Sequence, residues 1–146
     1  MQVLPYLMLE GRCEEAIEFY QEALGAEVCF MMRMGEIPQQ PGEEICQGQF
    51  VPDPQKISHA HLKIGANELL LSDGMNSGQC EFKGITLALT AADEAECRRL
   101  FAALAKDGAV QMELGPAFFS PLWGCCADKF GLNWMVMAPS SLSGKA

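Results

Sequence analysis

The two histidines of the chain, His59 and His61, stand two residues apart in the segment ISHAHLKI. Alternate residues of a β-strand point to the same side, so both imidazoles would project from one face of a strand here. Two imidazoles at that spacing can bind one divalent ion, with Glu68 or Asp73 as a third ligand. The same groups could instead perform acid–base chemistry, with His59 as general base and Asp73 as the group that orients it.

The segment from Ile57 to Gly74 must position these residues, and its pattern predicts two short strands joined by a turn at residues 65–67. One side is apolar and suited to packing under a helix, with Ala60, Leu62, Ile64, Leu69 and Leu71. The other side carries the histidines with Ile57, Lys63, Glu68, Leu70 and Ser72, and is polar enough to line a pocket. A solvated face of an antiparallel sheet alternates in the same way, and Asp73 before Gly74 is typical of a simple turn. Functional and purely structural interpretations therefore both stay open.

Composition limits the class of partner. The chain has 146 residues, a formal net charge of -9 and a hydrophobic fraction of 49%. That composition is typical of a folded domain, whereas the net negative charge disfavours nucleic acid and anionic membrane surfaces. No apolar run approaches the roughly 18 residues that cross a bilayer. The amino-terminal segment MQVLPYLMLEGR lacks the basic region of a signal peptide and predicts a first strand.

Cysteine usage indicates a reducing compartment. The seven cysteines form an odd count and include no C-x-x-C pair. Several fall within apolar strand or helix patterns, where a free thiol behaves as a small core residue. We therefore expect a cytoplasmic protein with free thiols.

Hydrophobic periodicity predicts the same order of elements twice. The first series has strands at 3–9 and 27–34 around a helix at 13–24, then a loop or lid at 35–55 and the central pair of strands. The second has strands at 82–90, 109–114, 118–127 and 132–138, with a helix at 93–107. We expect two βαβββ modules, 1–76 and 77–138, that form one compact domain, followed by a flexible tail at 139–146.

This repeated order, with the helix motif AIEFYQEALG at 16–25, resembles the vicinal oxygen chelate superfamily, which includes glyoxalase I, bleomycin-resistance proteins and extradiol dioxygenases. Within it the chain is most similar to the PhnB-like family, through PYLMLEG (5–11), MGEIP (34–38), LLLSDGM (69–75) and DKFGLNW (128–134). The resemblance implies an α+β fold of curved mixed sheets around a cup-shaped cavity, and a homodimer. Some PhnB-like sequences carry the label demethylubiquinone methyltransferase, but this chain has no glycine-rich strand-to-helix turn to hold a methyl donor.

In metal-using members of the superfamily, four inward residues bind a divalent ion. The resemblance places those positions at Pro5, at Leu70 or Ser72, at Gly84 and at Met135. Four of these five residues offer no side-chain ligand for such a divalent ion and Ser72 is a poor one, so the usual metal site is predicted to be absent. The sequence therefore indicates no certain cofactor, and a divalent metal is possible only at a relocated site.

Two hypotheses of function follow. The first is a protein that binds a small apolar or aromatic molecule without the usual metal, in a pocket lined by Tyr6, Leu70, Ser72, Trp123 and Met135. The second is an enzyme of lyase, isomerase or dioxygenase type that acts on a small oxygenated substrate. Its metal ligands or acid–base groups would be His59, His61 and Asp73.

Overall fold

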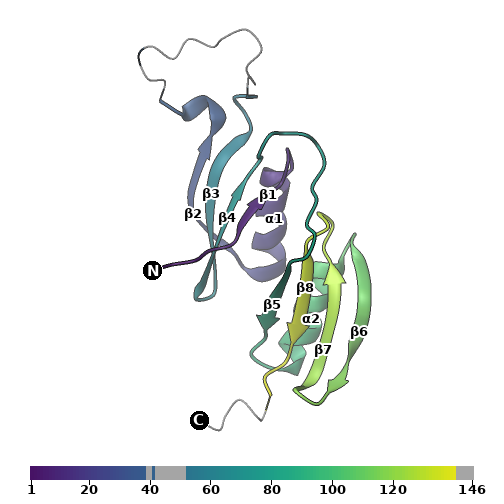
Figure 1. Ribbon diagram of the computed structural model, residues 1–146. Coiled ribbons are helices and arrows are strands. Elements are labelled where there is room, and N and C mark those ends of the chain that lie inside the picture. The colour runs from purple at the N-terminus through teal and green to yellow at the C-terminus, as the bar shows by residue number, and fades with distance from the viewer. Residues whose placement is uncertain (39–40, 42–51, 141–146) are drawn as a thin grey trace. The chain divides into compact units, whose positions relative to one another are not determined.

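The computed structural model describes residues 1–38, 41 and 52–140. The chain forms two compact units, Met1–Cys80 and Glu81–Ala146. Each runs strand, helix, strand, strand, strand, so the predicted repeat is confirmed (Figure 1). Most of the predicted lid at 35–55, and the predicted tail from residue 141 onward, lie outside the described residues.

The first unit is one mixed sheet with a helix on one face. Its elements are β1 (Tyr6–Met8), α1 (Cys13–Leu24), β2 (Glu27–Arg33), the 3-10 turn η1 (Met34–Glu36), β3 (Ile57–Ile64) and β4 (Asn67–Ser72). The strand order is β1-β4-β3-β2, with β1 parallel to β4 and the other pairs antiparallel. Leu62 and Leu71 are fully buried, as are Ala16 and Tyr20 of α1. The predicted apolar side is thus the helix-covered side, and we call the opposite side the open face of the first sheet.

Helix α1 begins and ends where its residues predict. Glu14 and Glu15 lie in its first turn, where the helix dipole favours negative charge. Gly25 follows the helix with φ +66°, and its N–H donates to the carbonyl of Gln21. Glycine adopts that left-handed conformation without strain, so it closes the helix.

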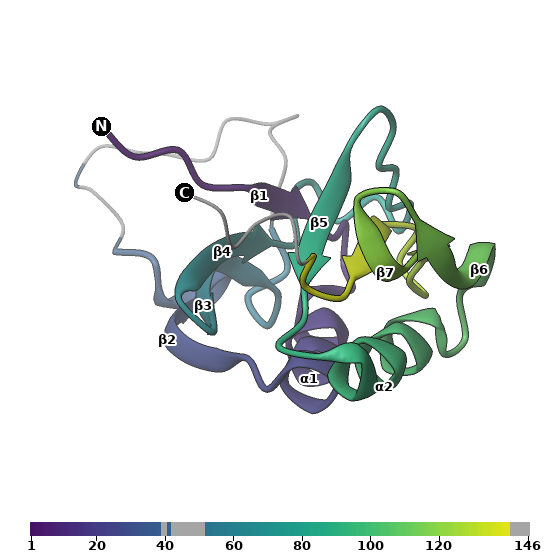
Figure 2. The same ribbon diagram turned by 90° about the horizontal axis from the view of Figure 1, so that it is seen from below.

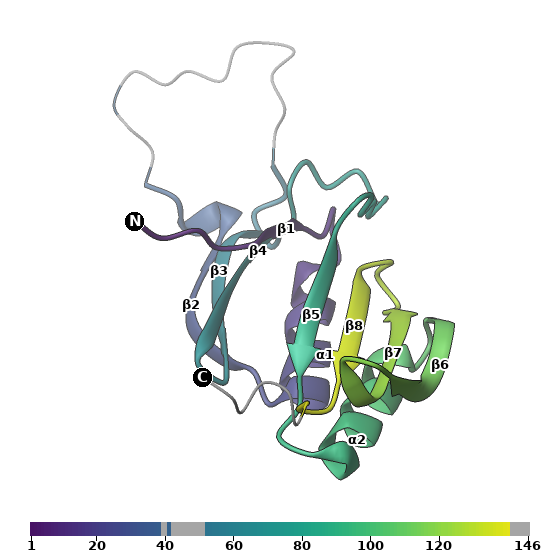
Figure 3. The ribbon, with the colours of Figure 1, turned by 60° about the horizontal axis from the view of Figure 1, so that its bottom comes forward.

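The second unit has the same topology. It contains β5 (Thr86–Thr90), α2 (Glu94–Ala105), β6 (Ala109–Ala117), β7 (Ser120–Ala127) and β8 (Asn133–Met137). Its strand order is β5-β8-β7-β6, with β5 parallel to β8, as Figure 3 shows. Helix α2 lies along one face of this sheet and buries Leu100, Phe101 and Leu104 (Figure 2). We call the other side the open face of the second sheet.

The observed elements differ from the predicted ones at several ends. Strand β5 starts at Thr86 rather than residue 82, because Gly84 has φ +70° and interrupts the extended backbone. Helix α2 stops at Ala105 rather than residue 107, since Lys106 already has an extended ψ of 125° and Asp107 has φ +60°. Ile57, predicted on the polar side, is fully buried at the start of β3.

Candidate functional site

Aromatic and imidazole rings form a row across the open face of the first sheet. Tyr6 comes from β1, His59 from β3 and Phe30 from the edge strand β2. The Tyr6 hydroxyl lies 3.0 Å from Nδ1 of His59, and the two ring centroids are 5.5 Å apart. Phe30 is on the other side of the imidazole, with its centroid 6.0 Å away. Tyr6 and Phe30 are 41% and 46% exposed, so the row presents an accessible aromatic surface.

Hydrogen bonding orients the central ring of this row. A neutral imidazole has one donor and one acceptor nitrogen, and the Tyr6 hydroxyl can match either role. Because Nδ1 of His59 is engaged by Tyr6, the ring is held with its other nitrogen directed away from that contact. A fixed imidazole beside two exposed aromatic rings is suited to positioning a flat molecule.

The second histidine lies beside a carboxylate. Nε2 of His61 is 3.4 Å from Oε2 of Glu68, and their side chains are 28% and 38% exposed. The contact lacks hydrogen-bond geometry, and this Nε2 is a buried atom without a hydrogen-bond partner among the described residues. Glu68 also accepts a hydrogen bond from the Gln2 side chain, at 3.1 Å. A buried polar atom without a hydrogen bond costs free energy, so a ligand that offers one to this nitrogen would gain that energy. Glu68 would have to move to let such a group approach.

The remaining predicted pocket residues of the first unit lie on β1 and β4. Tyr6 and Leu70 are direct neighbours in the parallel pairing, as are Met8 and Ser72. The Ser72 hydroxyl lies 3.1 Å from the sulfur of Met8 and is only 4% exposed. Leu70 therefore extends the apolar surface beside Tyr6, whereas Ser72 is mainly an internal contact.

Asp73 is not grouped with the histidines and has a structural position instead. Its Oδ1 accepts a hydrogen bond from the N–H of Cys13 at 2.8 Å, and its Oδ2 accepts one from the N–H of Ile57 at 2.6 Å. The side chain is 1% exposed. It therefore supplies the cap at the start of α1 that Arg12 does not provide, and it fixes the start of β3. The hypothesis that Asp73 orients His59 or binds a metal receives no support from these contacts.

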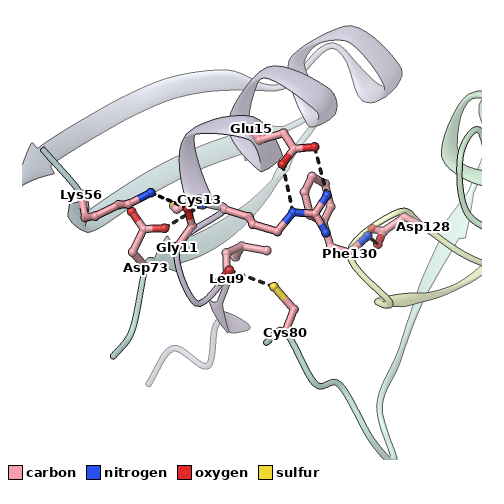
Figure 4. Close-up of polar contacts among 10 residues, drawn as sticks. Leu9, Gly11, Cys13, Glu15, Lys56, Asp73, Cys80, Asp128 and Phe130 are labelled. Carbon is pink, nitrogen blue, oxygen red and sulfur yellow. Dashed lines mark hydrogen bonds and ion pairs between the residues drawn. The ribbon is translucent and has the colours of Figure 1, made fainter. Parts of the chain in front are cut away.

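Figure 4 shows short contacts between the turn before α1 and Lys56, Asp73 and Cys80. Lys56 donates to the carbonyl of Gly11 at 2.8 Å, and the Cys80 thiol lies 2.8 Å from the carbonyl of Leu9. Glu10 accepts a hydrogen bond from the N–H of Ser77 at 2.9 Å, which lowers the pKa of that carboxyl. The loop after β4 is thus tied to the turn before α1, and sequence reasoning did not identify Glu10 as a participant.

The predicted pocket residues Trp123 and Met135 belong to the second unit. They lie on β7 and β8, where Trp123 pairs with Met137 and Met135 pairs with Cys125. The Trp123 ring packs against Phe119, with centroids 5.2 Å apart. These residues form an apolar group on the open face of the second sheet.

The superfamily's metal positions do not offer a fitting donor set. Pro5 precedes β1 and Gly84 precedes β5, while Leu70 and Met135 lie within strands. None of these four side chains can bind a divalent ion. Within residues 1–38, 41 and 52–140, no three His, Cys, Asp or Glu side chains are grouped so that they could hold a metal ion.

Sequence reasoning missed Phe30. Its strand, β2, departs from regular register between Val28 and Phe30 and again between Met32 and Arg33. Simple alternation along an irregular strand does not assign faces correctly. The only sequence signal was an aromatic residue in a strand next to the histidine strand.

The last two strands are joined by a turn built on a second buried aspartate. Oδ1 of Asp128 accepts from the N–H groups of Phe130 and Leu132, at 3.0 and 3.1 Å. Its Oδ2 accepts from Nε1 of Trp134 at 2.9 Å. Asp128 therefore holds this turn through two backbone N–H groups and the Trp134 indole, which accounts for the DKFGLNW motif.

Comparison with known proteins identifies relatives along almost the whole chain. A family model described as 3-demethylubiquinone-9 3-methyltransferase matches residues 1–137. Protein YjdN of Escherichia coli strain K12 is 36% identical over 139 residues, which cover 93% of this chain and 94% of YjdN. No helix within the described residues is both long and apolar enough to span a membrane.

Solved structures of similar proteins also match almost the whole chain. Protein PA1353 of Pseudomonas aeruginosa is 34% identical with a TM-score of 0.79, covering 95% of this chain and 98% of that one. A Bacillus cereus PhnB protein, titled a putative 3-demethylubiquinone-9 3-methyltransferase, is 28% identical with a TM-score of 0.75, covering 94% and 99%. A glyoxylase/bleomycin resistance protein/dioxygenase domain from Frankia is 14% identical with a TM-score of 0.61, covering 97% and 93%, and shows the fold alone. The chain therefore belongs to the PhnB-like family described as 3-demethylubiquinone-9 3-methyltransferase, and it has the glyoxalase/bleomycin-resistance fold.

Proposed function

We propose that the chain binds a small organic molecule that combines a flat apolar or aromatic ring with one polar group. The observation that supports this most is the row of Tyr6, His59 and Phe30 on the open face of the first sheet. A ligand ring would stack on the exposed aromatic side chains, and Leu70 would widen the apolar surface. Its polar group would reach His61 and Glu68.

The contacts of such a site contribute a modest binding free energy, and its residues are better suited to binding than to catalysis. Each aromatic contact is worth about 0.5–1.5 kcal/mol beyond the area buried. The hydroxyl of Tyr6 holds the imidazole of His59, so less freedom is lost when a ligand stacks on it. The metal positions of the superfamily lack ligands, which removes the Lewis acid that its enzymes use.

A second candidate function is acid–base catalysis on a small oxygenated substrate. The contact that favours it is the one between Tyr6 and His59, because a phenol and an imidazole within 3.0 Å can exchange a proton. In this form Tyr6 replaces Asp73 as the partner of His59. A relocated metal on His59, His61 and Glu68 would require these side chains to rearrange, because they are not grouped to hold an ion in the structure described, and both oxygens of Asp73 are engaged by backbone N–H groups.

The test uses the fact that the chain contains two histidines. In protein labelled with ¹⁵N-histidine, the ring signals of His59 and His61 can be assigned from one variant each. We expect 2-naphthol and catechol to shift the His59 ring signals saturably, and Tyr6→Ala with Phe30→Ala to weaken binding by about tenfold or more, as loss of two aromatic contacts predicts. The exposed Phe118→Ala substitution in the second unit is the matched control. Absence of a saturable shift at either ring with both probes would contradict the proposal.

Elemental analysis tests the form of the second candidate that uses a relocated metal. Protein purified without chelator would carry one equivalent of a transition metal per chain under the relocated-metal form of the second candidate. The His59→Ala, His61→Ala double variant would then lose it. Binding of the aromatic probes by metal-free protein would favour the first candidate.

We also propose that the chain forms a homodimer in the cytoplasm. The dimer is supported by exposed apolar side chains on the edge strand β2, where Val28 and Met31 are 40% and 41% exposed. Light scattering coupled to size-exclusion chromatography would give twice the 15.9 kDa of one chain. The compartment is supported by six described cysteines that are all free thiols.

A further inference from the structure

Three sulfur-containing side chains occupy neighbouring positions on the second sheet. In the pairing of β6 with β7, Met112 is opposite Cys125, and the register shifts on either side of Met112, between Val110 and Met112 and between Met112 and Gly115. In the pairing of β7 with β8, Cys125 is opposite Met135. Met112, Cys125 and Met135 thus form one row across three adjacent strands, which we call the sulfur row. The strands β6, β7 and β8 lie side by side in Figures 1 and 3.

The sulfur row lies on the open face of the second sheet. A Cβ atom added to Gly124 would come within 3.0 Å of the Phe101 ring of α2, so residue 124 faces the helix. Cys125 is next along the strand and therefore faces the other way. Directly opposed residues point to the same side of a sheet, so the register places Met112 and Met135 on the side of Cys125. Burial agrees, because Cys126, Trp134 and Val136 are buried, whereas Cys125 and Met135 are half-buried. Met112 is 49% exposed, so the row is accessible from solvent.

The ligands in this row are all soft. Thiolate and thioether sulfur prefer soft ions such as Cu(I) over hard divalent cations. Beyond Met135 the row continues to Ala88 of β5, so its four register positions contain no carboxylate or imidazole. Directly opposed residues have Cβ atoms about 4.5–5.5 Å apart, and methionine has three rotatable bonds, so its sulfur can approach an ion next to Cys125.

We propose that the sulfur row binds one monovalent soft metal ion, Cu(I) or its analogue Ag(I), through the sulfurs of Cys125, Met112 and Met135. Binding deprotonates the Cys125 thiol, and the proton passes to solvent, so no oxidant or reductant is required. Met137 lies one position further along, opposite Trp123, and is a reserve thioether. This inference goes beyond the proposed function, which concerns the open face of the first sheet.

The test must distinguish the row from the other thiols. Reduced full-length protein is titrated with Cu(I) under anaerobic conditions in competition with bicinchoninate, which suppresses binding to isolated cysteines. The Met112→Leu, Met135→Leu double variant keeps all seven thiols and nearly the same side-chain volume. The matched control is Met34→Leu, Met75→Leu, two methionines of the first unit that lie outside the row.

We expect one tight equivalent for the natural chain and for the control. The row variant should lose affinity by at least the roughly 10- to 100-fold that removal of an outer-shell group costs at a metal site. Cys125→Ser should lose the tight equivalent as well. Equal affinity in the row variant and the control would place Cu(I) on other thiols and overturn the inference, as would absence of a tight equivalent in the natural chain. Matching urea midpoints for the variants show that any loss is not caused by unfolding.

Discussion

Replacing Asp73 by alanine removes the acceptor of two backbone N–H groups at once. Those of Cys13 and Ile57 lie 2.8 and 2.6 Å from its carboxylate oxygens, in a place where the side chain is 1% exposed. Water cannot replace the carboxylate there without opening the structure. Each buried donor left unsatisfied costs about 1–3 kcal/mol, so we expect Asp73→Ala to lower the free energy of unfolding by about 3 kcal/mol. That is a large part of the roughly 5–15 kcal/mol that stabilises a typical domain.

Two comparison variants make this prediction specific. Asp93 caps α2 by accepting from the N–H of Glu96 at 2.8 Å, but it is exposed. Because water can accept the hydrogen bond of the Glu96 N–H when the carboxylate is removed, Asp93→Ala should lower the free energy of unfolding by only about 1 kcal/mol. Asp73→Asn keeps one acceptor oxygen but turns an amide NH₂ toward the second donor, so we expect a loss between those of the two alanine variants.

Urea unfolding followed by circular dichroism measures these differences, provided that the slope with denaturant is unchanged. Hydrogen exchange adds a local readout, because the amides of Cys13 and Ile57 should lose protection in Asp73→Ala. A change below about 0.5 kcal/mol, the range of ordinary surface substitutions, would refute the structural role. Loss of aromatic-probe binding by folded Asp73→Asn would instead restore Asp73 to the functional site.

Other predictions concern a salt bridge, a turn and a thiol. Glu14 accepts a hydrogen bond from the Arg33 guanidinium, and this contact lowers the pKa of Glu14 below its ordinary 4.5. The ion pair therefore stabilises the folded protein above pH 4.5, and this stabilisation is lost as the pH falls through the lowered pKa. Glu14→Gln should thus flatten the acid limb of a stability–pH curve, and an unchanged limb would contradict this. Gly11 has φ +106°, and a Cβ atom there would overlap Oδ1 of Asn76. Gly11→Ala should therefore lower the midpoint of urea unfolding, and an unaltered midpoint would show that the turn adapts to the added methyl group. Among the described thiols, exposed Cys29 should react first with Ellman's reagent. In a Cys46→Ser background, retention of the fast phase after Cys29→Ser would disprove this.

Sequence periodicity predicted the elements well where a single helix or strand has a regular pattern. Helix α1 was predicted at 13–24 and is Cys13–Leu24, because its apolar spacing and Gly25 are local signals. Strand β5 was predicted too early, since Phe82 and Ile85 resemble strand residues while Gly84 turns the chain with φ +70°. A backbone angle at one glycine is not visible in a hydrophobic pattern.

The candidate site was predictable only in part, because its contacts join distant residues. The strand with His59 and His61 was recognised, but the Tyr6 partner of His59 lies 53 positions away. Asp73 was grouped with the histidines because it is near them in sequence, whereas its carboxylate contacts Cys13, 60 positions away. Phe30 was missed because the irregular register of β2 shifts its face.

The parallel pairing of the first and last strands in each unit affects how the chain can fold during synthesis. All the pairing partners of the first sheet lie within Met1–Cys80, because β1 pairs with β4 rather than with a strand of the second unit. Once residue 80 has left the ribosome, that sheet can complete its hydrogen bonds before β5 is synthesised. The cap at Cys13 forms only when Asp73 arrives, so α1 gains its final support at the end of this first stage. Folding would then proceed in two vectorial steps, one for each repeat.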